Sequence, residues 1–285
     1  MSLMTAKTSW SRRLARWAAA PFKALDDLGE QTVFYGRAIT WVPKAIKSYK
    51  TEQIRLIAEV GMSNGALAII GGASVITLFI TFFAGINGGV QVFQVLSDLN
   101  LEALAGFSGA IIVPRLLTPI VAGSALAATV GTGFTAQLGA MRISEEIDAL
   151  EVMSVRSLPY LVSTRVAAGV VTIIPIYAMA MVGGWLAWRF SLVSFYGLSG
   201  GTYDHYFQTF MQPTDILYAI IQAVGVAVVV ILIHTYYGYT ASGGPVGVGE
   251  AVGKAVRASL VAVMTVCLLV ATALYGGAGT LRISG

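Results

Sequence analysis

Four long apolar runs constrain this chain more than any other feature of its sequence. A bilayer core of about 30 Å is crossed by roughly 20 apolar residues in a helix. With 56% hydrophobic and 11% charged residues, the chain is far from the balance of a soluble domain, where about a quarter of the residues are charged. The sequence therefore predicts an all-α integral membrane protein. The four helices are expected near Gly65 to Ala84, between Arg165 and Arg189, near Ile216 to Tyr239, and between Arg257 and Arg282.

A fifth apolar run, from Ala103 towards Gly133, is interrupted by Pro114, Arg115 and Pro119. It is too long for a loop, so it is counted as a span that is either kinked or broken. A charge inside a span normally faces a protein interior, a water-filled cavity or an anionic partner. Arg115 therefore either meets a lipid headgroup or a carboxylate in a translocation cavity, or marks the outer end of a span that starts later, near Leu116.

The lysines and arginines predict the orientation of the five spans. Ten of them precede the first span, and the loops after spans two and four carry three and two more. The opposite side has only Arg189 and Arg282. The positive-inside rule places the N-terminus in the cytoplasm and the C-terminus outside, as expected for a multi-pass plasma membrane protein.

The first sixty residues form a separate cytoplasmic or interfacial segment, ahead of a membrane domain over 61–285. Trp10, Leu14 and Trp17 recur at helical spacing beside arginines, which predicts an amphipathic helix in the headgroup plane. The alternative is a disordered basic tail. The positive charge, with a pI of 9.2, indicates anionic lipid headgroups rather than nucleic acid.

Catalytic and metal-binding chemistry is not predicted. The glycine-rich stretch over 243–256 fails the phosphate-loop spacing and is interpreted as a flexible cytoplasmic turn before the last span. His205 is expected to form a solvated loop pair with Asp204, and His234 to be a hydrogen-bonded helix-end residue. Cys267 has no second cysteine and no ligand cluster around it. No cofactor is expected on this chain.

A cluster of carboxylates follows span two, in the stretch "TAQLGAMRISEEIDALEVMSV" over 135–155. Ser144 before Glu145 and Glu146 is typical of a helix start, with the hydroxyl as the cap and the acids at the positive end of the helix dipole. Ile147 and Leu150 then share one face. A short cytoplasmic helix with an apolar ridge and a charged surround is suited to docking in a partner's groove; the alternative is a solvated connecting helix.

The run "TVGTGFTAQLGAMRISEEIDALEVMSV" resembles the signature of the MlaE/YrbE family, the permeases of Mce-type lipid ABC transporters. "RLLTPIVAG", from Arg115 to Gly123, and "GPVGVGEAVGKAVRASLV" resemble further family segments. The resemblance implies five spans after an interfacial N-terminal segment, with a coupling helix at about 144–155 that contacts the ATPase subunit. The coupling residues that it implies are Arg142, Ser144, Glu145, Glu146, Ile147, Asp148, Leu150 and Glu151.

The resemblance also implies partners. These are a cytoplasmic ATPase dimer that carries ATP and Mg²⁺, hexameric Mce proteins on the outer side, and a lipid substrate from one of four classes: fatty acid, mycolic acid, sterol or phospholipid. Arg115, Pro119 and Gln137 are the expected substrate-pathway residues.

The chain departs from the family pattern at Gln137, Leu116 and Thr129, where the family has charged residues. These losses suit one half of a heterodimer with a sister permease, as in an actinobacterial B-type YrbE protein that imports lipid. The alternatives are an ion-coupled lipid carrier, for which no inverted repeat or acid buried within a span is seen, and a lipid enzyme, which lacks a catalytic constellation.

Overall fold

The structure of the chain is a computed structural model that describes residues 28–62 and 72–276. Within these ranges every regular element is helical. Five helical stretches have the length and apolar composition needed to cross a membrane, which confirms the predicted number. They are Ser74–Asp98, Glu102–Ile143, Leu158–Phe195, Pro213–Tyr239 and Gly244–Tyr275. The amphipathic helix predicted around Trp10 to Trp17 lies outside the described residues.

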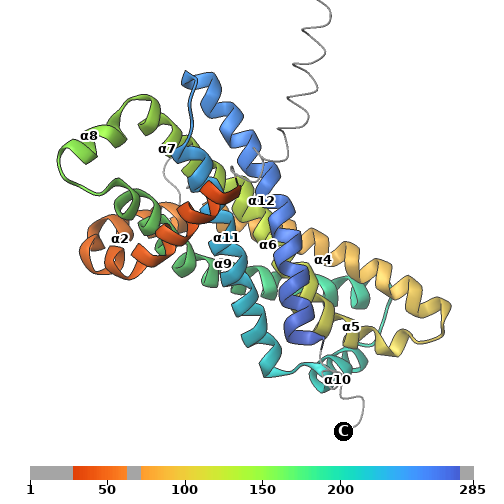
Figure 1. Cartoon of the computed structure of the whole chain (residues 1–285). Helices are drawn as coiled ribbons and strands as arrows, with labels where there is room; N and C mark the ends of the chain where they lie inside the picture. Colours follow the sequence, from red (N-terminus) through yellow and green to blue (C-terminus); the bar gives the residue numbers. More distant parts are fainter. Residues whose placement is uncertain (1–27, 63–71, 277–285) are drawn as a thin grey trace, which may run out of the picture.

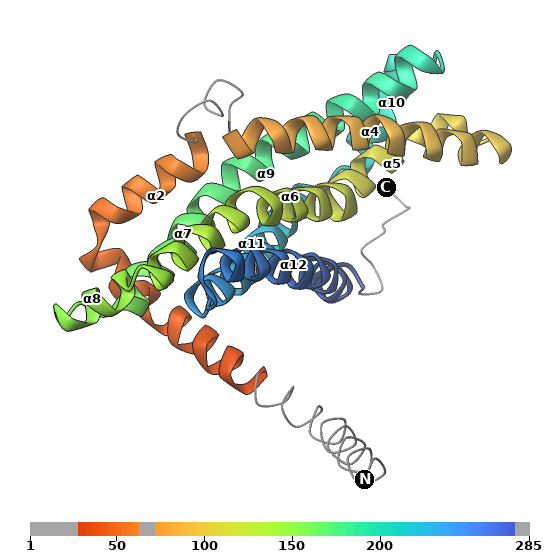
Figure 2. The same cartoon turned by 90° about the horizontal axis from the view of Figure 1, so that it is seen from above.

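The molecule is elongated, and its long helices run between two ends (Figure 1). One end holds α2 (Lys50–Met62) and α8 (Glu146–Val152), and the other holds α5 (Ala105–Ile112) and α10 (Gly200–Phe210). Between them run α4 (Gly72–Asp98), α6 (Thr118–Leu126), α7 (Thr132–Ile143), α9 (Thr164–Phe190), α11 (Pro213–Tyr239) and α12 (Gly244–Tyr275). The stretch α5–α7 and helix α9 are largely buried, whereas α4 and α12 flank the bundle and expose most of their surface (Figure 2).

The second span is one continuous helical stretch despite its prolines. Val113–Leu117 and Ala127–Gly131 adopt π-helical turns between the α-helical segments. Pro114 has no N–H to donate, and the wider turn lets the Thr118 N–H reach the carbonyl of Val113. The stretch is continuous through Arg115, so the broken helix is wrong. Because 42 residues are about twice the length that a bilayer core needs, the interpretation that Arg115 marks the outer end of the span stays a prediction.

Glycines explain why α4 extends to Asp98, well past the predicted end at Ala84. A Cβ at Gly85 would lie 2.9 Å from the carbonyl oxygen of Gly184, and one at Gly88 would lie 2.7 Å from the ring of Trp188. The absence of side chains therefore lets α4 pack directly against α9, and this packing stabilises a helix that glycine would otherwise weaken.

The last helix begins at Gly244, so the prediction of a flexible turn over 243–256 is wrong. Gly243 takes a left-handed conformation with φ of 89°, which turns the chain into the helix. Pro245 lies in the first turn, where its missing N–H costs nothing. Ala251 and Ala255 then pack inside the bundle.

The segment predicted to be an outer loop contains helix α10, which packs on α5. Gly106 of α5 approaches the carbonyl of Tyr203 so closely that a Cβ would lie 2.3 Å from it, and the Tyr203 side chain is buried. Asp204 pairs with Arg189, with both N–O distances 2.9 Å, and not with His205 as predicted. The guanidinium of Arg189 lowers the pKa of the Asp204 carboxyl.

Candidate functional site

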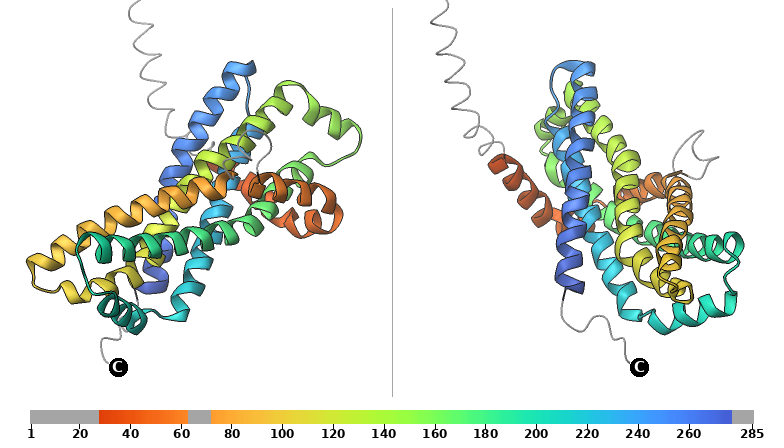
Figure 3. Two further views of the ribbon diagram at one scale, coloured as in Figure 1. Left: turned by 180° about the vertical axis from the view of Figure 1, so that it is seen from behind. Right: turned by 90° about the vertical axis from the view of Figure 1, so that its right-hand side faces the viewer.

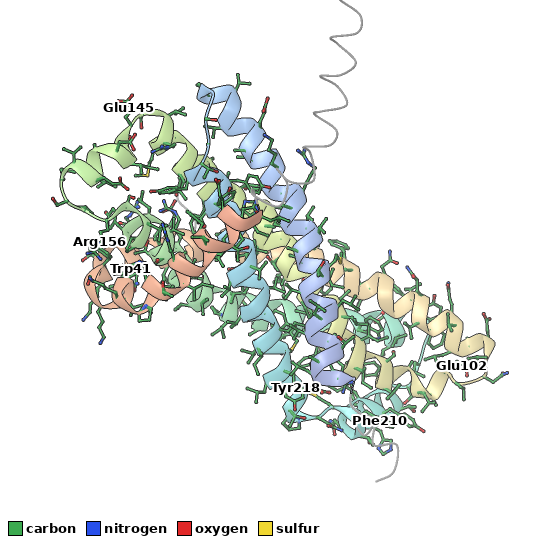
Figure 4. The ribbon with its side chains drawn as sticks, viewed as in Figure 1. Trp41, Glu102, Glu145, Arg156, Phe210 and Tyr218 are labelled. Atoms are coloured by element: carbon green, nitrogen blue, oxygen red, sulfur yellow. The ribbon has the colours of Figure 1, made fainter. Side chains whose placement is uncertain are left out.

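Helix α8 is a short helix at the end of the molecule reached by α7. The chain reverses after Ile143 through Glu145, whose φ of 61° is left-handed, and α8 begins at Glu146. Figure 4 shows Glu145 at this end, far from Glu102 and Phe210 at the other. The prediction that Ser144 caps the helix is wrong. Its hydroxyl lies 3.0 Å from the carbonyl of Ala140 and 2.9 Å from Glu146 Oε1, so it closes α7 instead.

The apolar face of α8 packs on the chain itself. Ile147 is 1% exposed and forms a small cluster with Leu138 of α7 and Leu161, and Leu150 packs at its edge. The predicted apolar ridge is present. The prediction that it docks on a partner is wrong, because the ridge packs on spans two and three of the chain itself. Ile147 therefore joins α8 to spans two and three.

Acids and two apolar side chains form the exposed surface of α8. Glu145, Glu146, Asp148 and Glu151 are all exposed, and Arg142 forms an ion pair with Asp148 at 2.7 Å. Val152 and Met153 follow at the end of the helix and are 86% and 65% exposed. Sequence reasoning missed these two residues, although their spacing from Ile147 places them away from its buried face. Apolar side chains this exposed beside acids make a surface suited to a protein partner.

A hydrogen-bond chain fixes the far end of α8 to the bundle. The hydroxyl of Ser157 donates to Glu151 Oε1 at 2.5 Å and lies 2.8 Å from the hydroxyl of Tyr239, at the end of α11. Ser157 is buried. The exposed acid Glu151 is thus connected through Ser157 to span four, which sequence reasoning did not predict.

Arg115 meets a carboxylate of the chain itself. Its Nη2 lies 3.0 and 2.9 Å from the two oxygens of Asp215, and its guanidinium lies 4.4 Å from the ring centre of Tyr275. The side chains of Arg115 and Asp215 are 11% and 6% exposed. The ion pair therefore ties spans two, four and five together, and Asp215 is an acid buried in the first turn of span four, where the sequence indicated none.

Gln137 joins a different polar network at the opposite end of span two. Its amide nitrogen donates to Glu59 Oε1 of α2 at 2.5 Å, and its amide oxygen lies 3.3 Å from Nη2 of Arg165. Arg165 is 2% exposed and also donates to the carbonyl of Leu161. The network connects α2, α7 and α9, so in this structure Gln137 acts as a bridge between helices.

The three predicted pathway residues do not form one site. Pro119 is buried in the first turn of α6. Arg115 and Gln137 are 22 positions apart on one continuous helical stretch, roughly 33 Å at 1.5 Å per residue. An apolar pocket of about 290 Å³ opens beside Leu116, between α4 and the turns around α6, and Trp188 is part of its lining. Its mainly apolar lining suits hydrocarbon.

His234 is a buried helix residue with a partner on each ring nitrogen. Nδ1 lies 2.8 Å from the hydroxyl of Thr135, and Nε2 lies 3.1 Å from that of Ser259. The predicted hydrogen bonding is confirmed, and it joins α7, α11 and α12. Among the residues that the structure describes, no group of histidine, cysteine and acidic side chains is arranged to hold a metal ion.

These features together define a class of protein: a helical membrane protein with five spans and a short surface helix packed on two of them. The sequence model of the family described as "Permease MlaE" matches residues 62–273. The chain therefore belongs to the MlaE permease family.

Relatives in other organisms agree with this assignment. The intermembrane phospholipid transport system permease protein MlaE of Haemophilus influenzae is 30% identical over 74% of this chain and 81% of its own length. A probable ABC transporter permease protein of Rickettsia bellii is 28% identical over 65% of this chain and 71% of its own length. The chloroplastic protein TRIGALACTOSYLDIACYLGLYCEROL 1 of Arabidopsis thaliana is 27% identical over 72% of this chain, which spans only 58% of that protein.

Proposed function

We propose that this chain is the permease subunit of an ABC transporter that moves lipid across the plasma membrane, driven by ATP hydrolysis on a separate subunit. The observation that carries the proposal is α8, an exposed acidic helix whose one buried side chain, Ile147, packs on spans two and three. The names of the relatives support it, because they include ABC transporter permeases and a phospholipid transport permease.

Coupling follows from the packing of α8. A push on its exposed surface is transmitted through Ile147 to Leu138 and Leu161, and through Glu151 and Ser157 to Tyr239. An ATPase that binds α8 differently in its open and closed forms shifts the balance between two arrangements of the spans. The ATPase partner, and not this chain, holds ATP and Mg²⁺ and carries out hydrolysis.

The lipid pathway lies beside Arg115 at the other end of the spans. The apolar pocket next to Leu116 accommodates hydrocarbon, and Arg115, which pairs with Asp215 of span four, is the neighbouring residue of span two. The exposed apolar residues Val261, Met264, Leu268 and Leu269 of α12 are available to face lipid or a sister permease. At three positions where the family has charged residues, this chain has Leu116, Thr129 and Gln137. The loss of these charges supports a heterodimer with a YrbE-type sister.

The same proposal covers the proteins that bind on the outer side of the membrane and the subtype of permease. Hexameric Mce proteins would contact the end formed by α5 and α10, and the N-terminus would be cytoplasmic by the positive-inside rule. Import of lipid, in an actinobacterial B-type YrbE protein, is the direction and subtype that the family resemblance favours.

The test is ATP-dependent lipid movement by the reconstituted complex. Proteoliposomes that contain the chain, its sister permease and its ATPase are loaded with labelled phospholipid, and its transfer is followed with ATP and with an ATPase variant that cannot hydrolyse it. Transfer that requires hydrolysis supports the proposal. Transfer that continues without hydrolysis and follows an ion gradient would replace it with the ion-coupled carrier.

A further inference from the structure

A groove lies at the end of the bundle near α8, between the helix over residues 28–48 and the connection over 151–159. Its volume is 620 Å³, and Phe34, Arg37 and Trp41 line one side while Glu151, Arg156 and Ser157 line the other. Figure 4 shows Arg156 and Trp41 next to one another at this end of the molecule. The groove is separate from the apolar pocket beside Leu116, which lies on span two near Arg115.

The groove is rich in cationic and aromatic groups. The guanidinium of Arg156 and the ammonium of Lys44 each lie 4.9 Å from the ring centre of Trp41. Arg37 and Arg156 are exposed, so neither is neutralised by a buried partner. Glu151 is the acid in the lining, and it already accepts a hydrogen bond from Ser157. Two guanidinium groups beside hydroxyls suit a phosphate, because arginine donates in a fork that matches its oxygens.

The position of the groove suits a lipid more than a soluble ion. Leu158 begins span three and Tyr239 ends span four, so the groove lies at the end of two apolar helices. Helices of this length and composition end in the headgroup layer of a bilayer. The helix over 28–48 is attached to the bundle by the buried Ala38, whose carbonyl accepts from Ser163 at 2.8 Å. Ile39 and Ile46 of that helix are about half exposed (48% and 47%). Exposed apolar and basic residues on one such helix are typical of a helix lying in the membrane interface.

A second cavity extends the groove along the helix. It has a volume of 730 Å³ and shares Phe34, Arg37, Leu158 and Tyr239 with the first. Its further lining includes Val33 and Tyr236, which offer apolar and aromatic surface for hydrocarbon, and the exposed acid Glu30. The two cavities together therefore provide a cationic end and a mainly apolar extension with one acid in its lining (Figure 3 shows this end from behind).

We propose that this groove binds the phosphate headgroup of an anionic phospholipid of the surrounding membrane, separately from the lipid that is transported. Arg37 and Arg156 contact the phosphate, Trp41 holds Arg156 in place, and the apolar extension receives the start of the acyl chains. Because Glu151 and Ser157 belong to both the groove and the hydrogen-bond chain of α8, a bound lipid also fixes α8 against the bundle.

The test measures lipid binding to the full-length chain. Native mass spectrometry monitors the binding while the chain is titrated with phosphatidylglycerol or with phosphatidylcholine. Replacing both Arg37→Gln and Arg156→Gln is expected to weaken phosphatidylglycerol binding roughly tenfold, which corresponds to about 1.4 kcal/mol. The matched control is Lys254→Gln with Arg257→Gln, two exposed cations at the start of α12, and it is expected to leave binding unchanged. The variant with Arg37→Lys and Arg156→Lys keeps both charges and should retain most of the binding. If it binds lipid while the glutamine variant does not, the loss comes from the site and not from the fold.

Three outcomes would overturn the proposal. They are equal affinity of the glutamine variant and the native chain, equal weakening in the Lys254 and Arg257 control, and equal binding of phosphatidylglycerol and phosphatidylcholine. A further arm adds inorganic phosphate as a competitor, and displacement of the lipid by it at similar concentrations would assign the groove to a soluble anion instead. The measurement contains no ATPase, so each of these results leaves the proposed transport function standing.

Discussion

Two of the arginine–aspartate pairs in the described part of the chain have nearly the same length but opposite surroundings. Arg115 and Asp215 lie 2.9 Å apart with side chains 11% and 6% exposed, whereas Arg142 and Asp148 lie 2.7 Å apart with side chains 39% and 59% exposed. Removing one member of a buried pair leaves a charge without a partner in an apolar interior, but an exposed pair is replaced by water at little cost. The buried pair therefore holds spans together, and the exposed pair is free to rearrange when a partner binds.

The largest effect is expected from Asp215→Asn. The substitution keeps the shape of the side chain but leaves the Arg115 guanidinium uncompensated, and the expected loss of stability is about 3–5 kcal/mol. Thermal unfolding of the detergent-solubilised chain measures it. The double variant Arg115→Met with Asp215→Leu removes both charges and should recover much of the loss. A single variant as stable as the native chain would show that the pair does not join the spans.

The next effect concerns the buried residue of α8. Ile147→Ala removes packing against Leu138 and Leu161 and is expected to cost about 2–4 kcal/mol, as typical large-to-small core substitutions do. Hydrogen exchange should then show α8 opening while spans four and five stay protected. Val152→Ala is the control, since Val152 is 86% exposed and its truncation should not change exchange. Unchanged protection of α8 in the Ile147→Ala variant would mean that packing on Leu138 and Leu161 does not hold α8 in place.

The exposed pair gives a smaller effect on stability. Asp148→Asn is expected to lower the free energy of unfolding by less than about 1 kcal/mol, because both side chains are largely hydrated. The same thermal unfolding assay as for Asp215→Asn makes the two pairs directly comparable. A loss similar to that of Asp215→Asn would erase the distinction between the buried and exposed pairs.

The smallest effect is a pH dependence at the other end of the molecule. The hydrogen bond from Arg189 lowers the pKa of Asp204, so the pair stabilises α10 above the unfolded pKa of the carboxyl and this contribution is lost as the pH falls through the lowered, folded value. Hydrogen exchange of α10 should increase in acid in the native chain. The Asp204→Asn variant should show high exchange at neutral pH and a weaker acid response. Equal acid profiles for the two proteins would exclude Asp204 as the titrating group.

Hydropathy alone predicted the number and order of the spans, because a bilayer needs long apolar helices and the described residues form five of them. Helix boundaries depended on packing that no local pattern shows. The glycines at 85 and 88 extend α4 because α9 lies against them, and the glycine-rich start of α12 is helical because Ala251 and Ala255 are buried by neighbouring helices. In both cases tertiary contact outweighed the low helix propensity of glycine.

The candidate site was predicted in part. The acids of α8 stood out because charge is scarce in this chain, and they are exposed as a docking surface requires. The direction of the apolar face was not predictable, since Ile147 finds its contacts on residues that the fold brings near it. The sequence placed the start of span four near Ile216, and nothing local indicated that Asp215 pairs with Arg115, a hundred positions earlier.

Co-purification tests directly whether the exposed acids of α8 bind the ATPase. The tagged chain is isolated in mild detergent beside a variant with Glu145→Lys, Glu146→Lys and Asp148→Lys, and beside a control with Asp98→Lys and Glu102→Lys at the opposite end. We expect the ATPase to accompany the native chain and the control but to be lost from the α8 variant. An ATPase that remains bound to the α8 variant, or that is absent from the intact native complex, would show that these acids do not bind it.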